Sequence, residues 1–151
     1  MKLKLYYFGK PREIKPAEQE LIRRIGFRAE IELISLSQAG IKTSPEKIKQ
    51  LEAEKLLAKI TDTEFLIALD ERGKQYDSPT FANWLKKQFV THGTISLVIG
   101  GAYGLDRLVL ERANSKLSFG SMVWTRNLVR HMTLEQLYRA LEIDGGGNFH
   151  K

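Results

Sequence analysis

The chain has 151 residues, a length that suits one domain, since a chain of this size buries roughly 70% of its unfolded surface on folding. It has no cysteine, which excludes disulfides, thiolate catalysis and cysteine-type zinc sites. Its 24 Lys and Arg against 18 Asp and Glu give a net charge of +6, which favours nucleic acid or another polyanion as partner, although solvated surface charge explains the balance equally well.

In the first half of the chain, apolar runs of strand length alternate with helical stretches. Strands are expected over residues 2–8, 28–36 and 65–70, the last apolar enough to be buried on both faces. Helices are expected over 16–25 and from Pro45 onward, where Ser44 and Pro45 form an N-cap pattern. The apolar face of the second helix would hold Ile48, Leu51, Leu56, Leu57 and Ile60.

The start of the chain leads directly into the first expected strand and shows no signal-peptide pattern. No apolar run approaches the roughly 20 residues that a membrane helix needs. We therefore expect a cytoplasmic protein with no membrane partner.

The second half repeats the alternation. Residues 71–74 are expected to turn, and a helix starting at Asp77-Ser78-Pro79 carries apolar residues at helical spacing. A strand over 95–99, a helix over 106–114, a short strand over 117–123 and a final helix over 127–143 follow. Loops are expected over 37–44 and in the glycine-rich tail after residue 143. Five βα units predict an α/β fold with a mainly parallel sheet and helices on both faces.

A glycine-rich bend, Gly100-Gly101-Ala102-Tyr103-Gly104, ends the strand over 95–99. Such a bend is where α/β proteins present backbone N–H groups to a ligand. Its spacing fits neither the dinucleotide fingerprint nor the phosphate loop of nucleoside triphosphatases. A bare glycine-rich turn is also often only structural, so the bend alone leaves the ligand open.

Other catalytic patterns are missing from the sequence. His92, His131 and His150 have no metal-ligand spacing, so no metal is expected. There is no Gly-x-Ser-x-Gly elbow for a serine nucleophile. Asp70 and Asp106 follow strand ends and could act as bases, but capping and turn roles explain them better.

Three segments gather at the ends of late strands: Leu69-Asp70, the glycine bend, and the run from Phe119 to Thr125 with the residues that follow it. Together with Leu137-Tyr138-Arg139-Ala140 at this spacing, they resemble the RlmH family of SPOUT-class methyltransferases, which methylate N3 of a pseudouridine in large-subunit ribosomal RNA. The resemblance covers nearly the whole chain. It implies one SPOUT domain over 1–151 with a C-terminal trefoil knot, an exception to unknotted topology.

The resemblance also implies S-adenosyl-L-methionine as cofactor, held in the knot largely by backbone atoms. The positions that match its contacts are Leu69, Gly100, Gly101, Gly104, Gly120, Ser121, Met122, Val123, Trp124 and Thr125. Glycines without a Cβ would let the chain approach adenine and ribose closely. The same glycines could equally close a tight turn.

On the substrate side the resemblance implies ribosomal RNA or the assembled ribosome as partner. Because the methyl group is already activated on a sulfonium, alignment and removal of the N3 proton remain for the protein, without a metal. Candidate catalytic residues are His150 and Arg139, and candidate substrate-binding residues are Arg126, Arg130, His131, Phe149 and Lys151. Solvent-exposed or dimer-contact positions explain Arg130 and Arg139 equally well.

The resemblance further implies a homodimer in which the tail of one subunit completes the site of its partner. Two departures from the family pattern lie on the substrate side. Arg126 stands where relatives usually have His, and Phe149 replaces the Tyr of a Pro-Tyr-His tail, which removes a hydroxyl. Two alternatives stay open: an RNA-binding protein of the same fold without methyl transfer, and an unrelated small α/β nucleotide-binding enzyme.

Overall fold

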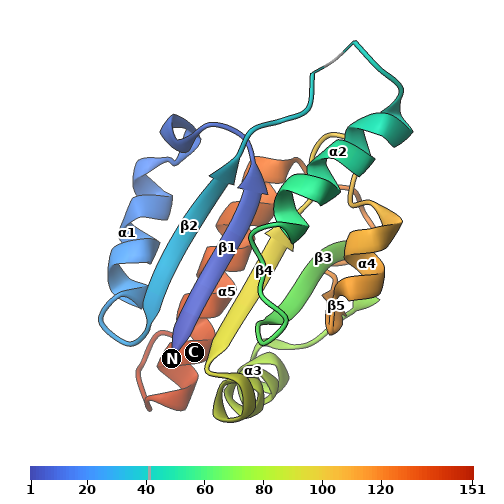
Figure 1. Ribbon diagram of the computed structural model, residues 1–151. Helices are drawn as coiled ribbons and strands as arrows, with labels where there is room; N and C mark the ends of the chain where they lie inside the picture. Colours follow the sequence, from blue (N-terminus) through green and yellow to red (C-terminus); the bar gives the residue numbers. More distant parts are fainter. Residues whose placement is uncertain (41) are drawn as a thin grey trace.

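The fold is built on one five-stranded sheet. The computed structural model describes residues 1–40 and 42–151, so Ile41 in the expected loop over 37–44 lies outside the described residues. The strands are β1 (Lys2–Phe8), β2 (Glu30–Leu36), β3 (Phe65–Lys74), β4 (Thr94–Ile99) and β5 (Ser115–Leu117). Their order is β2-β1-β4-β3-β5, every pair is parallel, and β2 and β5 form the edges (Figure 1). The predicted parallel α/β fold is confirmed.

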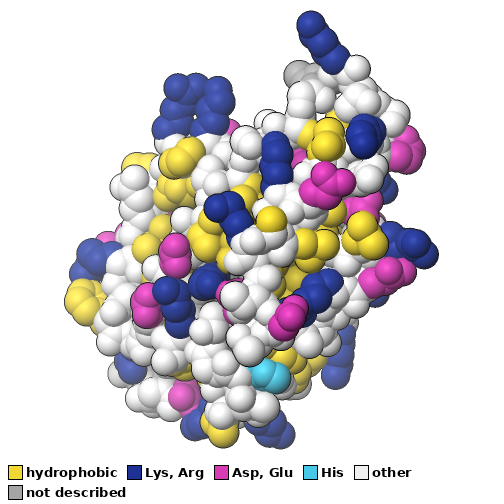
Figure 2. All heavy atoms as spheres, viewed as in Figure 1, with side chains coloured by type: hydrophobic (Ala, Val, Ile, Leu, Met, Phe, Trp, Pro, Cys, Tyr) yellow, Lys and Arg dark blue, Asp and Glu magenta, His cyan; other side chains and the backbone are white. Residues whose placement is uncertain are grey.

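One helix follows each strand. The helices are α1 (Pro16–Ile25), α2 (Pro45–Leu57), α3 (Ser78–His92), α4 (Arg107–Arg112) and α5 (Arg126–Asp144), and a short 3-10 turn, η1 (Pro11–Glu13), precedes α1. The side chains of Ser44, Asp77 and Asp106 cap the starts of α2, α3 and α4 by accepting backbone N–H groups. Asp106 therefore has the capping role expected of it. In the same view, Figure 2 shows Lys and Arg side chains gathered over η1.

The two faces of the sheet bury separate apolar clusters. Successive strand side chains point to opposite faces, so Leu5 and Leu97 pack toward α1, α3 and α5, whereas Tyr6 and Val98 pack toward α2 and α4. In Figure 1, α5 runs behind the sheet and α2 crosses in front of it. Burial on both faces explains why β4 reads as a continuous apolar run.

Several expected boundaries are wrong near β3 and β5. Residues 71–74 continue β3 instead of turning, with a register shift in which Leu69 and Lys74 both lie opposite Leu117. The strand expected over 117–123 is only Ser115–Leu117, because the backbone N–H of Gly120 donates to the Ser118 hydroxyl at 3.0 Å and the chain turns away. The remaining differences are small: β2 begins at Glu30, α4 ends at Arg112, and α2 ends before Ile60.

Glu64, just before β3, is a buried carboxylate that joins three segments. It accepts hydrogen bonds from Lys4 at 2.7 Å and from the Ser96 hydroxyl, and only 5% of its surface is exposed. Burial opposes ionisation of this carboxyl, but the bonds from Lys4 and Ser96 together hold its pKa below the usual value of 4.5. Glu64 is therefore charged in the folded protein at neutral pH.

Replacing Glu64 should have a pH-dependent cost. We expect Glu64→Gln to lower the free energy of unfolding by about 2 kcal/mol at pH 7, since charged hydrogen bonds are lost. A carboxyl whose pKa is lowered by folding stabilises the protein above its unfolded pKa, and this stabilisation disappears as the pH falls through the folded value. In urea titrations the deficit of the variant should shrink below pH 4.5. A deficit that stays constant with pH, or one matched by Glu46→Gln on the surface of α2, would contradict this role.

Candidate functional site

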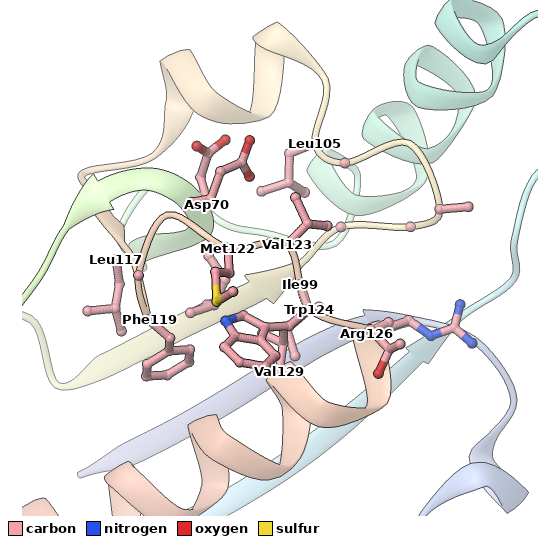
Figure 3. A pocket seen from close by; sticks show the side chains of 18 residues that line it. Asp70, Ile99, Leu105, Leu117, Phe119, Met122, Val123, Trp124, Arg126 and Val129 are labelled. Carbon is pink, nitrogen blue, oxygen red and sulfur yellow. The ribbon is translucent and has the colours of Figure 1, made fainter.

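A pocket of about 280 Å³ lies at the carboxyl ends of β3 and β4. Its walls come from residues 69–71, from the glycine bend after β4, and from the loop between β5 and α5 (Figure 3). Because carboxyl ends of parallel strands meet at one edge of a sheet, segments far apart in sequence come together here. Nine of the ten residues expected to contact a cofactor line the pocket: Leu69, Gly100, Gly101, Gly104, Gly120, Met122, Val123, Trp124 and Thr125. Ser121 belongs to the same loop but is not part of the lining.

The glycine bend is closed by its own backbone. The N–H of Gly104 donates to the carbonyl of Gly101 at 3.1 Å, and Gly104 has a positive φ of 81°. A Cβ on Gly100 would lie 2.8 Å from the backbone carbonyl carbon of Gly104, closer than real atoms approach. The glycines at 100 and 104 are thus required by the turn itself, and the turn forms a wall of the pocket.

The buried carboxyl group of Glu52, on α2, lies against this bend. A Cβ on Gly101 would lie 2.5 Å from a carboxylate oxygen of Glu52, which is 4% exposed on α2. Burial raises the pKa of Glu52, against the opposing effects of the Ala39 N–H and of Arg126. Sequence reasoning missed Glu52, because it stands among other charged residues of a helix and no local pattern marks it.

Apolar side chains cover the other wall. Met122, Val123 and Trp124 are 69%, 85% and 41% exposed, and Figure 3 shows them over the hollow between the loops. Exposed apolar side chains that cluster beside a pocket are typical of a binding site. Sequence reasoning also missed four apolar lining residues: Ile99 and Leu117 at the ends of β4 and β5, Leu105 after the glycine bend, and Val129 on α5.

The charged residues in the lining are Asp70, Glu71 and Arg126. Hydrogen bonds from the Arg72 side chain and backbone N–H lower the pKa of Asp70, which keeps this carboxylate ionised. The bond from the Arg72 N–H at 2.8 Å lies within β3, at the irregularity between Leu69 and Lys74, so Asp70 does not begin the turn expected there. Asp70 pairs with Arg72 and Arg126 pairs with Glu13, so both of these lining charges are compensated by a neighbouring side chain.

The two arginines at the start of α5 have different surroundings. Arg126 donates to Glu13 at 3.0 Å, and in Figure 3 its side chain points away from Met122 and Trp124. Arg130 was expected to contact the substrate, or to lie at the surface or in a dimer contact, and within one chain its burial fits none of these. Its side chain is completely buried, donates to both carboxylate oxygens of Glu18 at 2.7 and 3.0 Å, and lies over the ring of Tyr7. Arg130 is therefore a structural residue rather than a phosphate contact.

Of the remaining expected substrate-side residues, all but His131 lie around the second half of α5 and the tail. Arg139 pairs with Glu135, lies over the Phe149 ring at 4.6 Å and is 3.4 Å from Nδ1 of His150. Phe149 also packs on Tyr138, and Lys151 is exposed at the end of the chain. His131 lines a separate hollow of about 630 Å³ between α3 and α5.

The structure thus brings the expected cofactor residues together and places His150 and Arg139 elsewhere. Arg139 lies 13 positions after Arg126 on the same helix. At about 1.5 Å per residue this separates them by about 20 Å along the axis. Val129, which also lines the pocket, lies 10 positions before Arg139, or about 15 Å along the axis.

Two features are absent from residues 1–40 and 42–151. Within this part of the chain no three His, Asp or Glu side chains lie together as a set of metal ligands. Over the same residues, each helix is too short or too polar to cross a membrane.

Comparisons with known proteins agree on one family. A family model described as "Predicted SPOUT methyltransferase" matches residues 1–150. The chain is 40% identical over 148 residues to Ribosomal RNA large subunit methyltransferase H of Carboxydothermus hydrogenoformans, with 94% of this chain and 93% of the relative covered. Proteins of the same name from an Anaeromyxobacter species and from Pseudothermotoga lettingae are 37% and 34% identical, with at least 99% of each chain covered.

Proposed function

The chain belongs to the SPOUT methyltransferase family and is a methyltransferase, and from this we propose that it methylates N3 of a pseudouridine in large-subunit ribosomal RNA with S-adenosyl-L-methionine as donor. The observation that carries the proposal is the pocket at the carboxyl ends of β3 and β4, lined by nine of the ten residues that match donor contacts. The names of the relatives support ribosomal RNA as the substrate.

The lining offers such a donor a glycine-rich bend, apolar side chains and two acidic groups. The residues that would hold it are the glycine bend, Leu69 and the loop from Gly120 to Thr125. The donor supplies a methyl group activated on a sulfonium cation. Asp70 and Glu71 place negative charge in the wall, and the apolar side chains of Met122 and Trp124 would keep water from the reacting atoms.

In the proposed transfer, N3 of the base bonds to the methyl carbon, the electron pair of the broken C–S bond returns to sulfur, and the N3 proton leaves. We propose His150 as the group that accepts this proton and Arg139 as the cation that stabilises the developing anion. Their mutual distance of 3.4 Å supports joint action. Arg126, His131, Phe149 and Lys151 are the proposed contacts to RNA.

We further propose a homodimer, with the C-terminal part of each chain threaded as a trefoil knot over one domain of residues 1–151. The separation of about 15 Å along α5 between Val129, in the pocket lining, and Arg139, beside His150, supports the dimer, since a tail that cannot serve its own pocket could serve that of its partner. The site of each subunit would then contain side chains from both.

Mixing two inactive variants tests whether the tail acts on the partner. Gly100→Ala should spoil the pocket but leave the tail intact, and His150→Ala should do the opposite. Unfolded and refolded together in equal amounts, they should recover about a quarter of wild-type activity, because half of the dimers are mixed and each has one complete site. The measurement is methyl incorporation into ribosomes. No recovery, although mixed dimers form, would mean that each tail serves its own pocket.

The function itself is tested by mass spectrometry of ribosomal RNA from cells with and without the protein. We expect one pseudouridine to lose its N3 methyl group in the deletion strain and to regain it with the purified enzyme and donor. RNA of identical mass in both strains would reject the proposal. The alternative, an RNA-binding protein without transfer activity, is not favoured, and it predicts no heat of donor binding in calorimetry.

A further inference from the structure

The segment that follows β1, residues 10–18, separates its charges by sign. Its two acidic residues turn inward: Glu13 accepts from Arg126, and Glu18 is 2% exposed and accepts from Arg130. Its three basic residues, Lys10, Arg12 and Lys15, are exposed. Within residues 1–40 and 42–151, none of these three forms an ion pair. The exposed surface of the segment therefore carries more positive charge than the three cations and two carboxylates of its sequence would indicate together.

The segment is also fixed to the wall of the pocket. Besides the pairs with Glu13 and Glu18, the guanidinium of Arg130 donates to the backbone carbonyl of Glu13 at 3.1 Å. Arg126 and Arg130 stand in the first turns of α5, which follows directly on the loop that lines the pocket. The backbone that carries the three exposed cations is therefore held against the start of α5, next to that loop.

We propose that Lys10, Arg12 and Lys15, the η1 surface, bind the phosphate backbone of the RNA that carries the target base. The inference rests on the proposed function and adds a docking surface to it. Phosphate contacts fix the register of a nucleic acid on a protein, and they need exposed cations that no carboxylate neutralises. Figure 2 shows dark blue side chains projecting over η1, and the inward-facing carboxylates remove the nearest source of repulsion. Because residues 10–18 are held against α5 beside the pocket, they would set the distance between a bound phosphate and the methyl donor.

The test compares two double variants of equal charge. Lys10→Gln/Arg12→Gln removes two cations of the η1 surface. Lys59→Gln/Lys87→Gln removes two exposed lysines, one shortly before β3 and one in the last turns of α3, at the opposite end of the strands. Each double variant lowers the net charge equally. Methyl incorporation into ribosomes that lack the modification is measured over a range of salt concentrations, and donor affinity is measured by calorimetry.

For Lys10→Gln/Arg12→Gln we expect KM for ribosomes to rise about tenfold. The slope of log KM against the logarithm of the salt concentration should fall by about 1.4, since two phosphate contacts are lost. Donor affinity and kcat should stay within about twofold of wild type, and the control pair should change KM less than twofold. Equal effects of both double variants, or no effect of either, would overturn the η1 surface. These outcomes require an active wild-type enzyme, whereas failure of the proposed function would appear as a wild type that methylates nothing.

Discussion

Arg130→Met should lower the free energy of unfolding by about 3–5 kcal/mol, because it leaves the Glu18 carboxylate buried without its partner. Arg130 is 0% exposed and Glu18 is 2% exposed, so water cannot replace the lost hydrogen bonds. The variant also loses the bond to the Glu13 carbonyl and the contact with the Tyr7 ring. Urea unfolding followed by circular dichroism measures the effect.

Two controls separate the buried pair from other causes. Arg107→Met removes an exposed partner of Glu111 on α4 and should cost less than about 1 kcal/mol. Arg130→Met/Glu18→Leu removes both charges and should recover much of the stability lost in the single variant, because no unpaired charge remains buried. If the double variant were as unstable as Arg130→Met, the loss would come from packing around the arginine rather than from an unpaired carboxylate.

Gly100→Ala should weaken donor binding by about 100-fold, equivalent to about 2.7 kcal/mol. The new Cβ would lie 2.8 Å from the carbonyl carbon of Gly104 and 3.0 Å from the N–H nitrogen of Leu105. Both are backbone atoms, so relief requires opening the bend that lines the pocket. Overpacking of this kind typically costs about 1–3 kcal/mol. Here it destabilises the closed bend that lines the pocket, and donor binding weakens by that amount.

Isothermal titration with S-adenosyl-L-methionine measures the change. Gly26→Ala is the matched control, since Gly26 has an ordinary φ of −57° at the end of α1 and is absent from the pocket lining. It should bind the donor within about twofold of wild type. A folded Gly100→Ala variant with wild-type affinity would show that the bend does not contact the donor.

The sequence was most informative where structure is decided locally. The starts of α2, α3 and α4 follow from Ser44, Asp77 and Asp106, whose side chains satisfy backbone N–H groups a few residues ahead. The glycine bend was predictable as a pocket wall, because it stands where an apolar strand ends, whereas the individual donor contacts came from the resemblance to the family.

Predictions were poorer where distant segments decide the outcome. The extension of β3 and the early end of β5 depend on how the two strands register at Leu117. The burial of Arg130 depends on Glu18, which is 112 positions away in the sequence. A helix face that looks exposed in the sequence can be covered by another helix. Neither Arg130 nor Glu18 indicates this from its own sequence surroundings.

The edges of the sheet restrict how two copies of this chain can join. β2, one edge, has Glu30 and Glu32 with side chains 65% and 50% exposed, and β5, the other edge, offers only three residues. Charged side chains and very short strands discourage strand addition from a second molecule. Continuous sheets across two subunits, and the fibrous aggregates that exposed edges promote, are thus both disfavoured. Helices and loops are left as the surfaces through which subunits could assemble.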